Sequence, residues 1–162
     1  MSALQHKLPA IGFLAEVSAE HLSFLASHGR FLDLHPGDVL IAAGSEQESL
    51  FVILSGAVHI ITNVSGRQLL LAPLAPGDSI GEINLFDPAT ASATAICREA
   101  GLVWTLSRAE LGSFLEADPV VGVVVQRQLL ALLSKRIRCM NDKLATAEER
   151  AAMHNLWLHS PR

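Results

Sequence analysis

The residues best suited to chemistry lie in one short stretch, GEINLFDPATASATA, which runs from Gly81 to Ala95. This stretch combines an acid at Glu82 with small residues and with the hydroxyls of Thr90 and Ser92, which are the groups of a small anion-binding loop. Backbone N–H groups in such a turn can form a concavity that binds an anion. The stretch contains no Lys and no Arg, so it lacks the fixed positive charge that strengthens anion binding.

Other kinds of chemistry find little support in the sequence. The seven histidines show no metal-ligand spacing such as His-x-x-x-His, so we expect structural or surface roles for them and no metal site. Glu82, Ser92 and the histidines form no nucleophile–base signature, so we do not expect an enzyme. Cys97 and Cys139 show no Cys-x-x-Cys spacing, and both are expected to be free thiols.

Short β-rich segments alternate with turn signals between Phe31 and Leu106. The segments are VLIAA, SLFVIL, AVHIIT, QLLLAPL, TAICR and LVWTL. The turns include Ser55-Gly56, Ser65-Gly66 and a Pro-Gly-Asp triplet that occurs at 36–38 and again at 76–78. Short strands separated by such turns indicate a closed or doubled antiparallel sheet. We expect the two triplets to form two similar corners of one roll.

Helices are predicted on both sides of this β-rich region. Before it, SAEHLSFLASHG offers Ser18 as an N-cap and Gly29 as a left-handed C-cap. After it, SRAELGSFLEAD begins with a capping box at Ser107, and Asp118-Pro119 starts a further helix. We therefore expect an N-terminal helical segment at 1–30, a β-roll core at 31–106 and C-terminal helices at 107–158.

The last predicted helix can run unbroken to Leu158, because no proline interrupts it and its only glycine is Gly122. A second capping-box match at Thr146 supports the alternative, in which the helix breaks there. Within this segment apolar residues recur in alternating steps of three and four, the a/d pattern of a two-stranded coiled coil. Lys143 and Glu148 then fall at g and e positions that face each other across a parallel seam.

We predict that this stripe forms the seam of a homodimer. Leu129 and Leu132 lie beside the stripe and can pack on the chain's own β-roll. The alternative is that the stripe itself packs on that roll. The predicted seam consists of Leu130, Leu133, Ile137, Met140 and Leu144, with a weaker continuation at Ala147, Ala151, His154 and Leu158.

The order of these elements resembles the cyclic nucleotide-binding domain family, which includes the sensory half of catabolite-activator-type regulators. The resemblance covers roughly residues 8–145 and rests on HPGDVLIAAGSEQESLFVILSGAVHI, then LAPGDSIGEINLFDP, then SATA. It implies a mostly β fold with flanking helices: a double-stranded β-helix, or jelly-roll-like β-roll, with an N-terminal helix and a long C-terminal dimer helix. It also implies a bacterial signal-transduction protein.

In that family a phosphate-binding cassette opens with Gly-Glu and closes with Pro-Arg-(Ser/Thr)-Ala. The resemblance implies that Glu82 accepts hydrogen bonds from a ribose 2′-hydroxyl, and that Ser92 and nearby backbone N–H groups bind a cyclic phosphate. The alternative for Glu82 is a turn carboxylate that faces water. The residues implied to bind the ligand, cAMP or cGMP, are Gly81, Glu82, Ile83, Asn84, Thr90, Ala91, Ser92 and Ala93. We expect the segment that begins at Gly81 to fold as an anion-cradling turn.

The chain departs from the family pattern where Thr90-Ala91 replaces the Pro-Arg pair. Loss of a buried, charge-assisted contact of this kind costs about 2–5 kcal/mol, which two neutral hydroxyl hydrogen bonds do not replace. Other cations that could reach the loop are Arg67, Arg98 and Arg108, although nothing in the sequence places them there.

The composition of the chain limits which classes of protein it can belong to. The chain has 162 residues, of which half are apolar and 17% are charged, as in a single folded domain. The net charge of −4 argues against a nucleic-acid surface, and we see no signal peptide and no apolar run long enough to span a membrane. We therefore expect a cytoplasmic protein. Fifteen residues follow Ala147, too few for a helix-turn-helix, so we expect the output to pass through a protein partner.

Two functions follow from these observations. The first is a stand-alone dimeric sensor that binds a cyclic nucleotide or another small anion, weakly or atypically, and signals through its C-terminal helix. The second is a ligand-free dimeric interaction or scaffold protein that has lost nucleotide binding.

Overall fold

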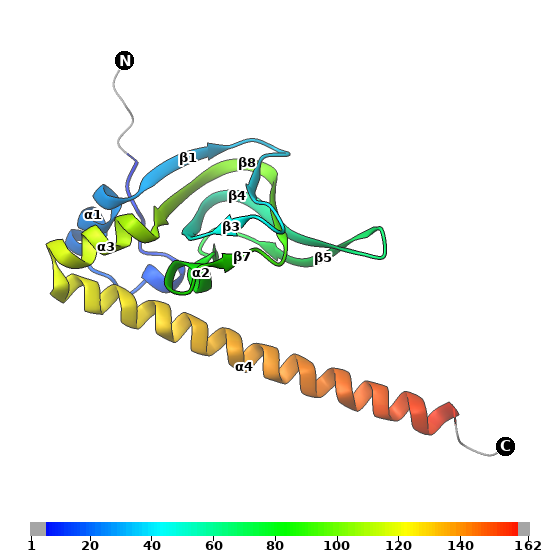
Figure 1. Cartoon of the computed structure of the whole chain (residues 1–162). Coiled ribbons are helices and arrows are strands. Elements are labelled where there is room, and N and C mark those ends of the chain that lie inside the picture. The colour runs from blue at the N-terminus through cyan, green and yellow to red at the C-terminus, as the bar shows by residue number, and fades with distance from the viewer. Residues whose placement is uncertain (1–5, 159–162) are drawn as a thin grey trace.

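The computed structural model describes residues 6–158 and places a curled antiparallel sheet beside a cluster of helices (Figure 1). A short 3₁₀ turn, η1 (Gly12–Leu14), precedes α1 (Ala19–His28). The short α2 (Glu82–Phe86) lies between two of the strands, and α3 (Arg108–Ala117) and the 40-residue α4 (Pro119–Leu158) follow the last strand. The strands are β1 (Arg30–Leu34), β2 (Val39–Ile41), β3 (Glu46–Gln47), β4 (Ser49–Val64), β5 (Arg67–Leu74), β6 (Ser79–Ile80), β7 (Ala89–Thr90) and β8 (Thr94–Ser107).

All described strand pairs are antiparallel. The main sheet has the order β1-β8-β4-β5, with β2 paired to β8 and β6 paired to β4, and a second sheet consists of β3 and β7. The prediction of a mostly β chain with an N-terminal helix and a long C-terminal helix is confirmed. None of the helices within residues 6–158 is both long and apolar enough to cross a membrane.

The predicted turn at Ser55-Gly56 is wrong, because β4 runs through it as one strand of 16 residues. The pairing of β4 with β8 shifts register on both sides of Ser55, so this site is a bulge. Gly56 has a φ of 80°, and a Cβ there would lie 2.6 Å from the carbonyl oxygen of Glu99. The small residue is thus required by a close approach between two strands and not by a chain reversal.

The repeated Pro-Gly-Asp triplets form two matching corners, as predicted. The backbone N–H of His35 donates to the Asp38 carboxylate over 2.8 Å, and the N–H of Ala75 donates to the Asp78 carboxylate over 2.9 Å. The central glycines have φ values of 97° and 95°, a conformation that glycine adopts without steric cost. The same three residue types therefore form the same kind of turn at both corners.

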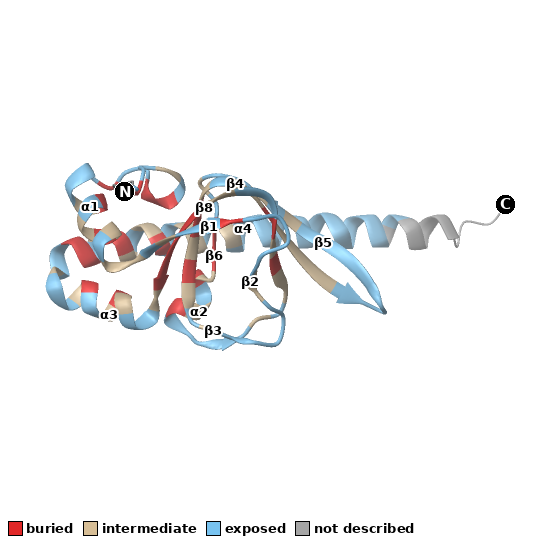
Figure 2. Ribbon diagram, turned by 90° about the horizontal axis from the view of Figure 1, so that it is seen from above, coloured by how far each residue is buried: buried red, intermediate tan, exposed pale blue. Residues whose placement is uncertain are grey.

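The apolar core has two parts, which Figure 2 shows as the buried segments of the sheet and of the helices. The larger part joins η1, α1, α3 and the start of α4 to one end of the sheet, around Trp104 and Phe114. The smaller part fills the inside of the roll and includes Ile53, Val58, Cys97 and Val103. The start of α4 is thus anchored in the core, while its remainder projects past the sheet (Figure 1).

Local helix signals are mostly confirmed. The Ser18 hydroxyl accepts a hydrogen bond from the N–H of His21, and Asp118 accepts from the first N–H groups of α4. The prediction for Gly29 is wrong: it is extended, with φ −112° and ψ −167°. A Cβ at Gly29 would lie 2.5 Å from the Trp104 ring, so the sheet and not the helix end requires this glycine. α4 is continuous through Thr146, which removes the alternative of a break there.

The capping box at the start of α3 is complete and gives a pH-dependent contribution to stability. Burial raises the pKa of Glu110, but hydrogen bonds from Ser107 and the nearby Arg30 guanidinium together hold it below its ordinary value. A carboxyl with a lowered pKa in the folded state stabilises the fold above its unfolded pKa. That stabilisation is lost as the pH falls through the folded value.

Glutamine can still accept the hydrogen bond of the capping box, so replacing Glu110 with glutamine removes only the charge and is expected to lower the free energy of unfolding by about 0.5 kcal/mol at neutral pH. The difference from the parent protein should shrink as the solution is made acidic, which chemical denaturation at a series of pH values measures. Glu116→Gln on the exposed side of the same helix is the matched control. A difference that stays constant with pH would contradict this role of Glu110.

Candidate functional site

The segment that begins at Gly81 turns sharply into a short helix, α2 (Glu82–Phe86). Gly81 has a φ of 86°, and a Cβ there would lie 2.0 Å from the carbonyl oxygen of Ser49. Both the left-handed conformation and the close approach to β4 require glycine. The expected anion-cradling turn is thus wrong for residues 82–86, which form a short helix, and the loop begins only after it.

This helix directs Glu82 inward, where it is 3% exposed. Its Oε1 accepts a hydrogen bond from the guanidinium of Arg136, and the two side chains form an ion pair. Arg136 also donates to the backbone carbonyl of Ser79. The alternative of a carboxylate that faces water is therefore wrong for Glu82.

Arg136 is the partner of Glu82 that was not predicted from the sequence. It lies in α4, 54 positions after Glu82 in the chain. The three arginines considered from the sequence, Arg67, Arg98 and Arg108, are exposed, and no ion pair of the described residues joins them to this segment. The sequence places Arg136 at heptad position g, immediately before Ile137, so it lies next to the predicted seam. That position does not show in which direction α4 crosses the roll, and so it does not predict a contact with Glu82.

Two buried polar atoms beside this ion pair have no hydrogen-bond partner among the described residues. They are Oε2 of Glu82 and the hydroxyl oxygen of Ser79, which is 1% exposed. A buried polar group without a partner is costly, and such groups are rare in folded proteins. The Glu82 carboxylate therefore has one oxygen bound to Arg136 and a second that is closed off from solvent and has no hydrogen-bond partner among the described residues.

The other end of the predicted loop is closed by backbone pairing. The side-chain amide of Asn84 donates to the carbonyl of Ala89 over 2.9 Å, and β7 pairs with β3. The Ala91 N–H donates to Ser45, and the Ala91 carbonyl accepts from Gly44. Much of the loop backbone is thus committed to the adjacent β2–β3 connection.

The predicted ligand-binding residues differ in how they are placed. Glu82 is buried, and Gly81, Asn84, Ala91 and Ala93 are half-buried. Thr90 and Ser92 are exposed, so their hydroxyls face solvent. Ile83 is 60% exposed, so its side chain does not join the buried group around Glu82.

The segment offers a buried hydrogen-bond acceptor and lacks a charged donor. A buried carboxylate with a free acceptor oxygen fits the hydroxyl of a sugar. The loop at 89–93 contains no cation, and the guanidinium of Arg136 is bound to Glu82 and Ser79. The segment thus has a buried acceptor oxygen at Glu82 and no Lys or Arg of its own that could bind a phosphate.

The predicted dimer stripe is exposed in the single chain. Leu130, Ile137, Met140 and Leu144 are 59–68% exposed, while Leu133 is half-buried. Leu129 and Leu132 pack on the chain's own core, as expected. The alternative that the stripe itself packs on the roll is therefore wrong for its exposed members. From residue 137 to residue 151 every side chain of α4 is exposed, so Arg136 is the last partly buried residue before this projecting part.

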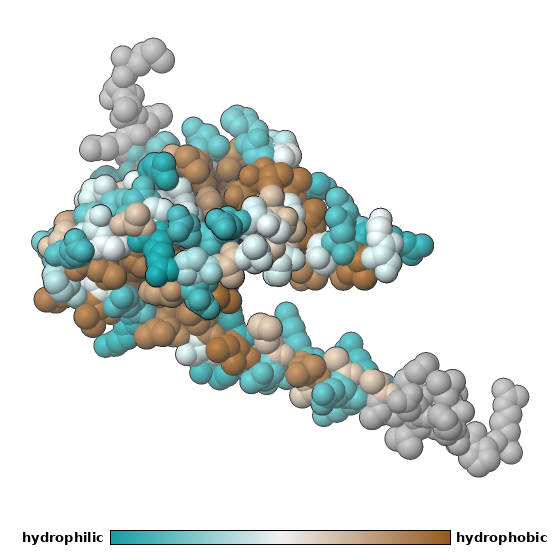
Figure 3. All heavy atoms as spheres, viewed as in Figure 1, coloured by the Kyte–Doolittle hydropathy of each residue, from teal (hydrophilic) through white to brown (hydrophobic). Residues whose placement is uncertain are grey.

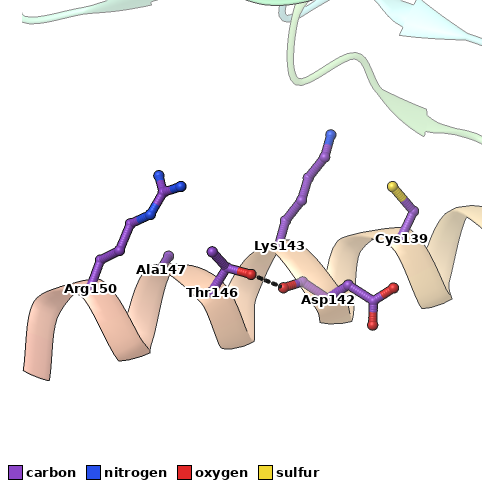
Figure 4. A pocket seen from close by; sticks show the side chains of 6 residues that line it. All are labelled: Cys139, Asp142, Lys143, Thr146, Ala147 and Arg150. Atoms are coloured by element: carbon purple, nitrogen blue, oxygen red, sulfur yellow. Dashed lines mark hydrogen bonds between the residues drawn. The ribbon is translucent and has the colours of Figure 1, made fainter.

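A surface pocket of about 440 Å³ lies elsewhere, on the projecting part of α4 (Figure 4). It is lined by six residues of that helix alone: Cys139, Asp142, Lys143, Thr146, Ala147 and Arg150. None of the predicted ligand residues lines it. Among residues 6–151 and 153, whose side chains the structure describes, no group of three or more His, Cys, Asp or Glu side chains is arranged to hold a metal ion. Both cysteines are free thiols, Cys97 buried and Cys139 exposed.

Comparisons with known proteins identify the family to which this fold belongs. The family model of the cyclic nucleotide-binding domain matches residues 31–118. The chain is 30% identical over 141 residues to the "CRP-like cAMP-activated global transcriptional regulator" of Mycobacterium tuberculosis, covering 85% of this chain and 60% of that protein. It also matches, over 65% of its length and 48% of the relative, the "Cyclic AMP receptor protein" of Thermus thermophilus, with 31% identity. The chain thus spans less than two thirds of the length of these relatives.

Solved structures show the same fold. The catabolite activator protein of Thermus thermophilus has a TM-score of 0.73 and 25% identity, with 84% of this chain and 62% of that chain covered. The N-terminal domain of a transcriptional regulator from Streptomyces coelicolor has a TM-score of 0.68 and 28% identity, with coverage of 82% and 90%. The predicted jelly-roll-like fold is confirmed by these neighbours.

Proposed function

The chain belongs to the cyclic nucleotide-binding domain family, and from this premise we propose that it is a regulatory sensor module with an atypical ligand site. Its ligand is a cyclic nucleotide, cAMP or cGMP, or another small anionic molecule that binds weakly. The ligand site consists of the residues from Gly81 to Asn84 and from Thr90 to Ala93. The observation that carries this proposal is the buried Glu82 carboxylate, which keeps one oxygen without a partner among the described residues.

A scaffold without a ligand gains nothing from such a group. Burying a carboxylate oxygen that accepts no hydrogen bond destabilises the fold, and an apolar side chain of similar size would avoid that cost. The arrangement is favourable when a ligand hydroxyl donates to the free oxygen. Its presence therefore supports a binding role for this part of the roll.

The ion pair of Glu82 with Arg136 supplies a physical link between the ligand and α4. A ligand that binds Glu82 changes the hydrogen bonding of the carboxylate that holds Arg136. Arg136 is the last partly buried residue of α4 before its projecting part, so a change in this contact alters how that part is held. For signalling through α4, the protein must have two conformations that differ in the position of this helix. The ligand must bind one conformation more tightly than the other.

We include homodimerisation in the proposal. The exposed apolar stripe of α4 is visible as separate brown patches along the projecting helix in Figure 3. Its members occur at the a and d positions of a parallel coiled coil, which buries them against a second copy. The output would then pass to a protein partner in the cytoplasm, without an enzymatic step by this chain.

A direct test compares the native chain with Ala91→Arg, which restores a guanidinium to the loop. We expect calorimetry and thermal shift to show weak or no binding of cAMP, cGMP and cyclic dinucleotides by the native chain. The variant should bind cAMP at least 30-fold more tightly, because a charge-assisted phosphate contact is restored. Ala131→Arg, on the exposed surface of α4, is the control for an added charge outside the loop.

Two outcomes would overturn parts of this proposal. If both the native chain and Ala91→Arg bind none of these nucleotides, the ligand-free scaffold is the correct function. Tight binding by the native chain would mean that another cation has replaced the lost guanidinium.

The scaffold remains the second candidate because of one specific observation. The Ala91 N–H and carbonyl, which lie where the family loop faces its phosphate, are both bonded to residues 44 and 45. A loop tied in this way, with no cation between Gly81 and Ala95, is what loss of nucleotide binding would leave.

A further inference from the structure

The end of β4 and the start of β5 project from the roll as a two-stranded ribbon, residues 61–71. Beyond Ile61, β4 is paired with β5 alone, because its last partner in β8 is Thr94. Among the described residues, no strand pairs with the other edge of β5. A two-stranded ribbon has little stability of its own in water, so it needs a further surface to pack on.

The ribbon carries a cluster of apolar side chains that its own chain leaves exposed. Four of them are 49–54% exposed: Val64, Leu69, Leu70 and Leu71. Leu69 lies directly opposite Thr62, so it shares one face of the ribbon with Val64. This face continues the inner face of the roll, where Val58 is buried. Clustered apolar side chains on a surface mark an interaction site, whereas scattered ones do not.

The ribbon overhangs one side of α4. Figures 1 and 2 show that the ribbon and the projecting part of α4 extend from the body in the same direction, with the ribbon displaced to one side of the helix. In Figure 3 an open space separates the two, and brown side chains border it on the ribbon. The apolar stripe of α4 is visible on the same side of the molecule. A single helix placed against that stripe would therefore also lie under the ribbon.

Resting on the proposed homodimer, we infer that the ribbon of each copy packs on α4 of the other copy. Arg136, at a g position, contacts Glu82, so the g side of α4 faces its own roll. Across a parallel seam, the g side of one helix lies beside the e side of the other. The e side of the second copy's α4 is therefore turned toward the roll and the ribbon of the first copy.

The e side of α4 is suited to covering apolar side chains. Ser134 and Asn141 occupy e positions, and Ala145 lies next to them at a b position; all three are exposed in the single chain. They are short and uncharged, so the ribbon can approach closely without removing an ion from water. Ile137 and Leu144, at a positions, border the same side of the helix.

The extent of the seam also favours a second copy as the occupant. A stable interface usually takes roughly 20–30 residues from each partner, and the predicted seam supplies five. The ribbon and the e side of α4 enlarge the same interface. Because a two-fold dimer contains each contact twice, both ribbons are covered in one assembly.

Hydrogen exchange measured by mass spectrometry tests the contact in the unmodified chain. Sedimentation velocity first identifies a concentrated, dimeric sample and a dilute, monomeric one. The amides of residues 61–71 should exchange at least about tenfold more slowly in the dimer. The amides of β1, at the opposite edge of the main sheet, are the control and should exchange at the same rate in both samples. Ribbon exchange that is equal in both samples would overturn the inference.

A substitution in the ribbon provides the second test. Leu69→Asp should raise the dissociation constant of the dimer at least about tenfold, because a charge enters the contact in both copies. Leu32→Asp makes the same change at an exposed position of β1 and should leave the dimer intact. Circular dichroism should show that both variants are folded.

The outcomes separate this inference from the homodimer on which it rests. If Leu69→Asp dimerises as tightly as the parent chain, the ribbon is not part of the interface, while the seam of α4 stands. If the parent chain is a monomer at every concentration, both the homodimer and the ribbon contact are wrong.

Discussion

Replacing Arg136 with leucine is expected to lower the free energy of unfolding by about 3 kcal/mol. The substitution removes the one cation paired with Glu82, a residue that is 97% buried, and leaves its carboxylate without compensation. Removing one partner of a buried pair typically destabilises a protein by about 3–5 kcal/mol. The lower end applies here because 35% of the Arg136 side chain is exposed. Chemical denaturation at a fixed protein concentration measures the change.

The double variant Arg136→Leu with Glu82→Leu separates the ion pair from simple packing. Removing both partners eliminates the uncompensated charge, so the double variant should be more stable than Arg136→Leu alone. Arg138→Leu, an exposed arginine two positions along the same helix, should change stability by less than about 0.5 kcal/mol. A single variant as stable as the parent would show that this contact does not hold α4 to the roll.

Replacing Ile137 with glutamate is expected to raise the dissociation constant of the proposed dimer at least about 100-fold. Ile137 is 59% exposed in the single chain and occupies an a position, where it would face its own copy across a two-fold seam. The substitution therefore puts two like charges into an apolar layer, where each loses hydration without gaining a partner. Sedimentation velocity over a range of concentrations measures the dimer.

Thr146→Glu is the matched control, since it makes the same change of charge at an exposed c position of α4. It should leave the dimer intact. Circular dichroism of both variants should show that α4 is still helical. If the parent chain is a monomer at micromolar concentration, or if both variants dissociate equally, α4 does not dimerise through this stripe.

The parts of the fold that were predictable from the sequence depend on neighbours within a few residues. The Pro-Gly-Asp corners close through a hydrogen bond from the residue before the proline to the aspartate. The caps at Ser18 and Ser107 bind N–H groups three residues later. Such short-range contacts form whatever the rest of the chain does, so residue types at fixed spacing identify them.

Two glycines show where that reasoning stops. Gly29 looks like a helix C-cap and Gly56 looks like a turn, yet each is required because another segment passes too close for a side chain. For Gly29 the neighbour is Trp104, and for Gly56 it is the backbone around Glu99. The sequence shows that a glycine is present but not which distant strand needs the space.

The candidate site shows the same division. The amino-acid sequence by itself determined the Gly-Glu opening, the hydroxyl-bearing loop without a cation and the heptad stripe of α4, because these are properties of type and spacing. Only the tertiary structure decided that Glu82 is buried, that its partner is Arg136 and that Ala91 is bonded to the β2–β3 connection. These contacts depend on the angle at which α4 crosses the roll and on how the sheet curls. That geometry results from the packing of the whole core and is not encoded in any one segment.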